Sequence, residues 1–458
     1  MISPSYPAGF DVRRFLDDQQ VSRLHVLLTL LGAAAVGMEG LDAQTIGYVA
    51  PQISREWNLP RAALGAVFSA SLLGMMLGAM VFGVLGDKLG RKRVVIWCMM
   101  LIGLATLAAA RSNSVTSLLV CRVLMGLGIG GVGTNIYALL SEYSPSRLRA
   151  TLIMLVTTSF PFGAGLGGVL AARIIPVFGW RSMFWIAGAV TVLLAPVLLV
   201  WLPDSLRQMI TRGESVERIR RLLQCIAPNC VIPSGVPLCV REPPTPGFPV
   251  WSLFRERRAA MTSMLWAMYF VTMLANYFVS SWLPSLGRDA GLSPGSALRA
   301  TYLFQFGGVA GALVFGLLMD RREPRGVMTL AFGGTGLFVA ALGFGWSSSW
   351  LLAATAFGAG FCINGTQIGD TFIAAVSYPT ALRSTGVGWG SAVGRIGAIS
   401  GPLIAGYLLA AGWDRSVMFV VAALLAVLIC GAIFALGSEL FPVMRPRVDV
   451  IPAERLSS

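Results

Sequence analysis

The chain has 458 residues, of which 55% are hydrophobic and only 12% are charged, whereas about a quarter of the residues in a soluble domain are charged. This composition excludes a soluble globular protein and indicates an integral membrane protein with many spans. The formal net charge of +14 would suggest a nucleic-acid partner in a soluble protein. In a membrane protein it is better explained by lysine and arginine in cytoplasmic loops, so we expect no nucleic acid.

The residue types also argue against an enzyme. The single histidine, His25, excludes a histidine-based triad and a multi-histidine metal site, and neither Lys88 nor Lys92 completes a G-x-x-x-x-G-K-[ST] phosphate loop. Cys225, Cys230 and Cys239 share one polar stretch, but a zinc site would need a fourth ligand and tighter spacing, so reduced thiols are favoured. We therefore expect no catalytic residue, no metal and no cofactor.

Along the chain, a polar N-terminal stretch without the features of a cleaved signal precedes a series of apolar segments. Each is near the length of about 20 residues that a membrane-spanning helix needs. The predicted spans are 24–49, 62–85, 94–110, 115–140, 150–173, 182–202, 259–284, 297–318, 327–346, 350–377, 385–410 and 415–437. The predicted domains are a cytoplasmic tail (1–23), a six-helix bundle (24–202), a cytoplasmic central loop (203–258), a second six-helix bundle (259–437) and a cytoplasmic tail (438–458).

The orientation follows from the basic residues. Most of the 35 lysines and arginines fall in segments on the same side of the membrane as both termini. Because lysine and arginine concentrate in cytoplasmic loops, we expect both termini in the cytoplasm of a bacterium and the chain in its inner membrane.

The first span carries two acids in the stretch GMEGLDAQTIG, residues 37–47. Glu39 and Asp42 are three positions apart, so they are predicted to share one face of a helix. An ionised carboxylate at bilayer depth costs about 2.5–3.5 kcal/mol on insertion scales, and such residues usually serve function. We expect this pair to take up and release protons. The alternative is that the two acids form static ion pairs with Arg122 or Arg395.

The two halves of the chain repeat. GVLGDKLGRKR (83–93) follows the second predicted span and GLLMDRR (316–322) follows the eighth, which places Asp87 and Asp320 233 positions apart. LRAT (148–151) and LRST (382–385) are 234 positions apart. Landmarks at nearly one offset indicate a duplicated six-helix unit, an architecture found among transporters.

The later spans add further polar residues. Arg395 lies near the middle of the eleventh span among small residues, and its planar guanidinium suits a carboxylate ligand. The alternative is that it balances an acid such as Asp370. Asn364, Gln367 and Asp370 recur every three residues in the tenth span and so predict one polar stripe.

These motifs resemble those of the major facilitator superfamily. GVLGDKLGRKR is similar to its loop signature, CRVLMGLGIGG with Arg122 to its span-four motif, and SEYSPSRLRAT and PDSLR to its elements after spans four and six. EGLD, NYFVSSWLPSL (276–286) and YPTALRSTGVGWGSAVGRIGAISGPLIAG (378–406) resemble the aromatic acid:H+ symporter branch, closest to its 3-(3-hydroxyphenyl)propionate and 4-hydroxybenzoate transporters. PFGAGLGG in span five lacks the Gly-Pro pair of the antiporter signature, which makes drug export less favoured.

The resemblance implies twelve helices in two pseudo-symmetric bundles and import of an aromatic carboxylate with protons by a monomer. The alternative is a transporter or exporter of another organic anion or drug. Glu39 and Asp42 are the expected proton-coupling residues. The expected substrate-binding residues are Arg395, Arg122, Asn364, Gln367, Asp370, Asn276, Tyr277 and Trp282, and in this superfamily spans one, four, seven and ten line the central cavity. Ordinary packing is the alternative for each aromatic, and a role in proton release is the alternative for Arg122. The expected gating residues at the cytoplasmic helix ends are Asp87, Arg91, Glu142, Arg147, Arg149, Asp320, Arg321 and Arg383.

Overall fold

The computed structural model describes residues 10–17, 19–213, 215–226, 238–239, 250–255, 258–345, 348–441 and 444. These residues include 12 helices that are long and apolar enough to cross a membrane, which confirms the predicted number of spans. The helices are α2 (Arg23–Glu56), α3 (Arg61–Leu89), α4 (Arg91–Ala110), α5 (Val115–Tyr143), α6 (Ser146–Phe178), α7 (Arg181–Trp201), α10 (Ala259–Asp289), α11 (Pro294–Arg321), α12 (Pro324–Phe344), α13 (Ser349–Ser377), α14 (Thr380–Ala410) and α15 (Arg415–Leu440).

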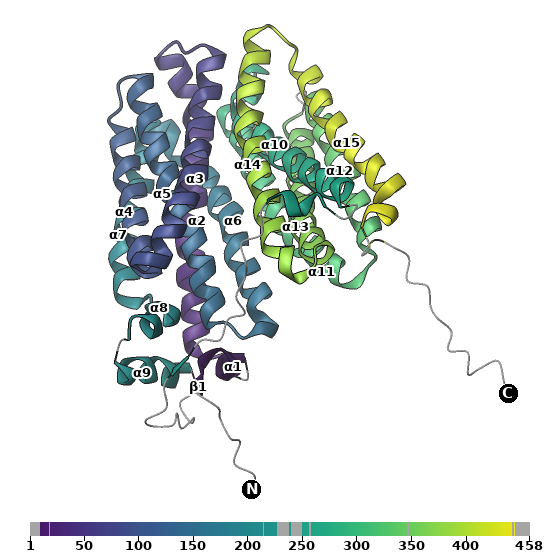
Figure 1. The fold of residues 1–458 in the computed structure, drawn as a ribbon. Helices are drawn as coiled ribbons and strands as arrows, with labels where there is room; N and C mark the ends of the chain where they lie inside the picture. The colour runs from purple at the N-terminus through teal and green to yellow at the C-terminus, as the bar shows by residue number, and fades with distance from the viewer. Residues whose placement is uncertain are drawn as a thin grey trace, which may run out of the picture.

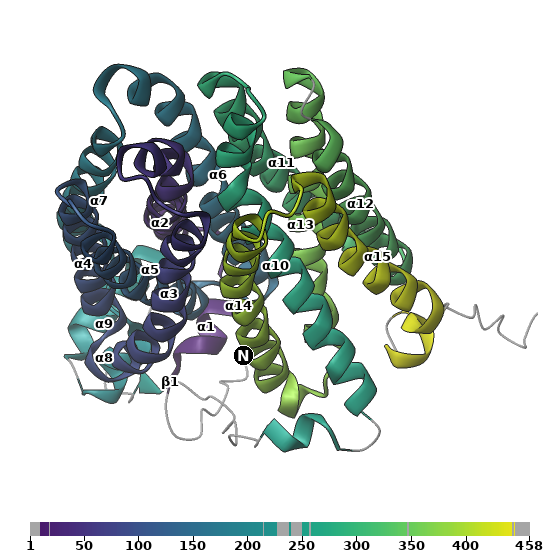
Figure 2. The same cartoon turned by 90° about the horizontal axis from the view of Figure 1, so that it is seen from above.

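The helices form two bundles that lie side by side, α2–α7 (the N half) and α10–α15 (the C half) (Figures 1 and 2). In the N half, α2 packs on α6, α3 on α5, and α4 on α7. In the C half, α10 packs on α14, α11 on α13, and α12 on α15. The second set repeats the first with each helix replaced by its counterpart six spans later. The expected pseudo-symmetric pair of six-helix bundles is therefore confirmed.

Close backbone contacts repeat with the same offset as the sequence motifs. A Cβ added to Gly74 or Gly78 of α3 would collide with the carbonyl groups of Val123 or Leu127 on α5. In the C half, a Cβ on Gly307 or Gly311 of α11 would collide with the carbonyl groups of Phe357 or Phe361 on α13. Gly74 and Gly307, like Gly78 and Gly311, are 233 positions apart. Glycine is required here because the two helix backbones touch.

Because the number of spans is even, α2 begins and α15 ends on one side of the membrane, which we call the terminal side; the other is the distal side. Between α7 and α10 lie α8 (Leu206–Thr211), α9 (Val216–Ile226), β2 (Leu238–Cys239) and the 3-10 helix η1 (Val250–Leu253). Strand β1 (Phe10–Asp11) pairs in parallel with β2. In Figure 1, β1, α1 (Val12–Asp17), α8 and α9 cover the terminal end of the N half.

Helix α1 is attached to the N half through its last residue. The Asp17 carboxylate accepts hydrogen bonds from the backbone N–H (2.8 Å) and the hydroxyl (2.6 Å) of Ser146, at the start of α6. Burial alone would raise the pKa of Asp17, but these bonds and the charges of Arg149 and Arg13 lower the pKa below its usual value. The depressed pKa means that this attachment is present at neutral pH and is lost as the pH falls through the folded-state value.

The halves meet through α3 and α14, α6 and α11, and α2 and α10. On the distal side, Arg61 pairs with Asp289 at 2.7 Å. Nearer the middle, the Ser69 hydroxyl donates to the carbonyl of Ile399 at 2.8 Å. Further toward the terminal side, Cβ atoms added to Gly83 of α3 and Gly388 of α14 would meet nothing within 4 Å. The contacts described between the halves thus lie on the distal side and in the middle of α3 and α14.

A single methyl group tests the backbone contact between α11 and α13. We expect Gly311→Ala to lower the stability of the purified protein by about 1–3 kcal/mol, the usual cost of overpacking, because its Cβ would collide with the Phe361 carbonyl. Thermal unfolding in detergent measures the effect. The control is Gly431→Ala on α15, whose Cβ would meet nothing within 4 Å. Equal melting temperatures for the two variants would contradict the close contact.

Candidate functional site

Glu39 lies in the middle of α2 with only 2% of its surface exposed. Its carboxylate faces α5, where a Cβ added to Gly133 would lie 3.6 Å from Oε2 and 3.9 Å from Oε1. Oε1 has no hydrogen-bond partner among the described residues. The groups whose charges act on Glu39 include Arg395 of the C half and Asp42 of its own helix. The absence of a side chain at Gly133 thus leaves room for the Glu39 carboxylate, which interacts electrostatically with Arg395 of the other half.

Arg395 of α14 reaches into the N half. Its guanidinium donates a hydrogen bond of 2.9 Å to the backbone carbonyl of Met75 on α3. It interacts electrostatically with Tyr277 of α10, with Glu39 and with Tyr137 of α5. We call Glu39, Tyr137, Tyr277 and Arg395 the central cluster. Because two of its members come from each half, a relative movement of the halves must change it.

Asp42 faces the interior of the N half instead. Its carboxylate accepts hydrogen bonds from the hydroxyl groups of Thr106 on α4 (3.2 Å) and Thr191 on α7 (2.8 Å), and none of its surface is exposed. The prediction of a shared helix face for Glu39 and Asp42 therefore needs correction. Positions three apart are still about 60° apart around a helix, and here that angle directs the two side chains to different neighbours.

Arg122 of α5 lies beside Asp42 without a direct ion pair in the described part of the chain. Its guanidinium donates to the backbone carbonyls of Asp42 (3.4 Å) and Ala43 (3.1 Å) and to the Ser71 hydroxyl (2.6 Å). Only 1% of its surface is exposed. Arg122 thus joins α5 to α2 and α3 inside the N half, away from the boundary with the C half.

The predicted stripe on α13 is divided between environments. Asn364 is buried, donates to the carbonyl of Gly360 on its own helix (3.2 Å) and packs where a side chain on Gly308 of α11 would be. Gln367 is half-buried. Asp370 is fully buried, and the charged groups that act on Arg395 do not include it. The alternative reading of Asp370 as counter-ion to Arg395 is therefore wrong for the conformation described.

The three predicted residues of α10 also differ. Asn276 and Tyr277 are half-buried, and Tyr277 belongs to the central cluster. Trp282 has no exposed surface, donates its indole N–H to the carbonyl of Pro402 on α14 (3.1 Å) and packs edge-on against Phe68 of α3. Trp282 thus helps to close the distal boundary between the halves.

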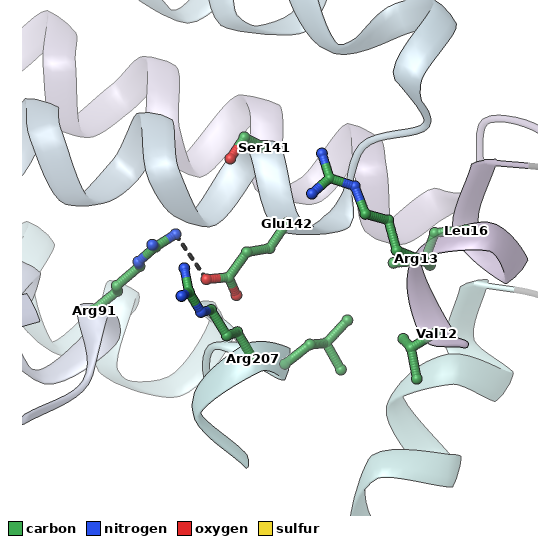
Figure 3. A pocket seen from close by; sticks show the side chains of 8 residues that line it. Val12, Arg13, Leu16, Arg91, Ser141, Glu142 and Arg207 are labelled. Atoms are coloured by element: carbon green, nitrogen blue, oxygen red, sulfur yellow. Dashed lines mark ion pairs between the residues drawn. The ribbon is translucent and has the colours of Figure 1, made fainter. Parts of the chain in front are cut away.

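The charged residues at the terminal side form a network within the N half. Arg91 bonds Asp87 at 3.1 Å and Glu142 at 2.7 Å. Figure 3 shows Arg91 and Arg207 directed toward the Glu142 carboxylate, in a cavity of about 230 Å³ that residues of α1 also line. Nearby, Arg147 donates to the carbonyl of Gln19 at 2.8 Å, and Arg149 lies 3.9 Å from Asp17.

The corresponding residues of the C half, Asp320, Arg321 and Arg383, are exposed, and none forms an ion pair with another described residue. The predicted gating set is therefore not assembled across the halves in this conformation.

Several residues of the site were missed from the sequence. Tyr137 is in the central cluster. Residues four positions apart lie on the same helix face, so the sequence alone could have placed Tyr137 beside Gly133. Thr106 and Thr191 carried no signal, since single threonines in apolar helices are common. Gln44 of α2 donates at 2.7 Å to the Ser280 carbonyl of α10, which lacks its usual helical donor because position 284 is proline.

Two other predictions concern metals and histidine. Among the described residues, no group of three or more His, Cys, Asp or Glu side chains could hold a metal ion. Cys230 lies outside these residues, so the alternative zinc site at the three cysteines is not decided. His25 is buried at the start of α2, where its ring nitrogens bond the Ser22 N–H (3.0 Å) and the Tyr143 carbonyl (2.9 Å).

Twelve spans in two repeated bundles, with a buried acid of one bundle interacting electrostatically with a half-buried arginine of the other, are the arrangement of a secondary transporter. The family model of the Major Facilitator Superfamily matches residues 32–303 and again 265–455. The chain belongs to this superfamily, and it is a multi-pass membrane transporter and not an enzyme.

Relatives of known substrate show which branch of the superfamily the chain is similar to. The 4-hydroxybenzoate transporter PcaK of Pseudomonas putida is 39% identical over 407 residues, 89% of this chain and 91% of that protein. The gallate transporter of the same species is 37% identical, covering 95% and 97%. The 3-(3-hydroxyphenyl)propionate transporter of Escherichia coli is 35% identical, covering 91% and 95%. These relatives confirm the resemblance stated from the motifs.

The solved structure of a bacterial homologue of the human lysosomal transporter Spinster, in an inward-facing and unoccupied conformation, has the same fold. It aligns with a TM-score of 0.69 at 16% identity and covers 92% of this chain and 98% of that one.

The Arg91–Glu142 pair gives a prediction for stability. Its side chains are 12% and 11% exposed, whereas those of the Arg181–Glu56 pair, of similar length at 2.8 Å, are 37% and 43% exposed. We expect a double-mutant cycle with alanine to give a coupling energy of about 2 kcal/mol or more for the first pair and below about 1 kcal/mol for the second. Chemical unfolding in detergent measures both cycles. Equal coupling energies would show that burial does not strengthen the first pair.

Proposed function

We propose that the chain is a proton-coupled importer of an aromatic carboxylate of the hydroxybenzoate or hydroxyphenylpropionate type, working by alternating access. The observation that carries the proposal is the central cluster, which joins an acid of the N half to an arginine of the C half. The substrate class is supported by the relatives that transport 4-hydroxybenzoate, gallate and 3-(3-hydroxyphenyl)propionate.

The cluster offers a physical reason for coupling. Arg395 is half-buried and carries one positive charge, so it can offset one carboxylate at a time. When Glu39 is ionised, it competes with a substrate carboxylate for this charge. When Glu39 binds a proton, the guanidinium fork is left for the substrate, and Tyr137 and Tyr277 can face an aromatic ring. Proton and substrate therefore bind together. Asp42, whose charge acts on Glu39, is assigned the onward transfer of the proton.

The predicted orientation identifies the cytoplasmic face of the carrier. With both termini in the cytoplasm, the terminal side faces inward, and the contacts between the halves on the distal side and in the middle support an inward-facing conformation. The proposal places the bundles at 24–202 and 259–437, with the tails and the 203–258 loop in the cytoplasm of a bacterial cell. The carrier is proposed to act as a monomer in the inner membrane. In its outward-facing state, the gating residues of the two halves are proposed to contact one another.

The first test is uptake into liposomes. We expect the purified protein to accumulate labelled 4-hydroxybenzoate or 3-(3-hydroxyphenyl)propionate when the outside is acidic, with competition from the preferred aromatic acid but not from a sugar. At zero membrane potential and a pH difference of one unit, each coupled proton is worth about 1.4 kcal/mol, or about tenfold accumulation. Uptake that does not depend on the pH gradient would overturn the proposed proton coupling. Transport in the outward direction alone would favour an exporter.

Glu39→Gln separates binding from coupling. Because glutamine imitates the protonated acid, we expect the variant to exchange internal for external substrate at near wild-type rates. Its accumulation should fall about tenfold per unit of pH difference, since one coupled proton is lost. The control is Glu439→Gln at the exposed end of α15. Unchanged accumulation in Glu39→Gln would remove Glu39 from the mechanism.

Arg395→Gln tests the carboxylate site. A hydrogen bond to a charged group is worth about 1.5–3 kcal/mol, so we expect the dissociation constant for the aromatic acid to rise about 10- to 100-fold. Calorimetric binding to the purified protein measures the change. Arg173→Gln, at an exposed position of α6, is the control. If Arg395→Gln binds the acid as the wild type does, the substrate carboxylate binds elsewhere.

A further inference from the structure

The C half contains a buried acid that the central cluster does not use. Asp370 lies on α13 with none of its surface exposed. Neither carboxylate oxygen forms a hydrogen bond with another described group. By contrast, Asp42, the fully buried acid of the N half, accepts two hydrogen bonds. A buried carboxylate without hydrogen bonds is expected to be neutral, because its charge would be uncompensated.

The surroundings of Asp370 contain no compensating cation. In the described part of the chain, no arginine or lysine is among the groups that interact with it. Beside it on α13, Gly369 packs on Met319 of α11 and Met328 of α12, which bring no charge. From α14, Arg395 interacts with Glu39, Tyr137 and Tyr277 instead. The titratable group in reach is Tyr269 of α10, on which the charge of Asp370 acts.

The hydroxyl groups near Asp370 are arranged to receive a proton and not to donate one. The side chain that approaches the carboxyl group is Thr272 of α10. Thr366 donates its hydroxyl hydrogen to the carbonyl of Ile363 (2.6 Å), and Thr272 donates its own to Thr366 (3.2 Å). The hydrogen of Thr272 is therefore already committed, whereas its oxygen can still accept. A protonated Asp370 can donate to the Thr272 oxygen and so complete this chain of hydroxyls.

A route toward open space begins one residue further along α13. Thr371 is exposed, and the Tyr269 hydroxyl lies 3.5 Å from its Oγ1. Tyr269 also packs against Gly390 and Gly394 of α14, so its ring lies between α10, α13 and α14. A shift of α14 would change how far its backbone covers the Tyr269 ring. It would thereby change the access of water to Asp370.

From this geometry we propose that Asp370 is a second proton-binding site, carried by the C half, which adds one proton to each transport cycle. The acid is neutral in the conformation described and releases its proton to water past Tyr269 and Thr371 when α14 moves. This inference deepens the proposed proton-coupled import and rests on it. It also removes Asp370 from the residues expected to bind the substrate directly.

The test counts protons in liposomes at zero membrane potential. For a pH difference of one unit, we expect about 100-fold accumulation by the wild type, about tenfold by Asp370→Asn, and none by the double variant Glu39→Gln/Asp370→Asn. Asp370→Asn should retain substrate exchange, and Asp370→Glu should keep the wild-type proton number. Equal accumulation by Asp370→Asn and the wild type would overturn the second site while leaving the proposed function intact.

A second measurement uses the unmodified chain and decides the matter if Asp370→Asn fails to exchange substrate. Dicyclohexylcarbodiimide reacts with protonated carboxyl groups in apolar surroundings. After treatment during turnover, we expect a mass adduct on the peptide that contains Asp370, and less of it at alkaline pH. No adduct on that peptide at any pH would overturn the proposal. A wild type without any response to the pH gradient would instead overturn the proposed function itself.

Discussion

The position of Arg395 constrains the rest of the molecule. A guanidinium near the middle of a membrane needs partners, and here it finds them in the opposite half, at the Met75 carbonyl and beside Glu39. Gly133 keeps the space next to Glu39 free of a side chain. On the distal side of Arg395 the halves are joined through Ser69, the Phe68–Trp282 contact and the Arg61–Asp289 pair. The charged contact thus lies near the middle of the α3–α14 boundary, where the proposed substrate would compete for it.

Much of the architecture could be predicted from the sequence, because hydrophobic length and basic loops reflect the bilayer itself. The repeat was visible in Asp87 and Asp320, and the same offset returns in the glycines that allow α3 to touch α5 and α11 to touch α13. The presence of ionisable residues in the spans was equally clear. Their partners were not, since helix periodicity gives a direction only relative to the helix axis. The rotation of α2 against α4, α5 and α7 separates Asp42 from Glu39, and no local pattern encodes that rotation.

The two halves repeat in fold but differ in their charges. In the N half, α1, α8 and α9 cover the terminal end, and Arg91, Glu142 and Asp17 are paired. In the C half, Asp320, Arg321 and Arg383 are exposed. The buried acids differ as well, since Asp42 is held by two threonines and Asp370 by none. Sequence similarity between the halves therefore predicts which helices pack together. It does not predict which charged side chains form ion pairs or hydrogen bonds.

Two of the contacts between the halves share one chemical trait. Ser69 and Arg395 donate to the backbone carbonyls of Ile399 and Met75. Each of these carbonyls also faces an N–H donor four residues further along its own helix, because neither position 403 nor position 79 is proline. When these contacts separate, the acceptor loses only its second partner and no orphaned carbonyl is left in the membrane. The acceptor at position 75 is also independent of the side chain there, so mutational drift of Met75 would leave it in place. These two contacts can thus open repeatedly at little enthalpic cost, whereas opening the contact from Gln44 leaves the Ser280 carbonyl without a donor.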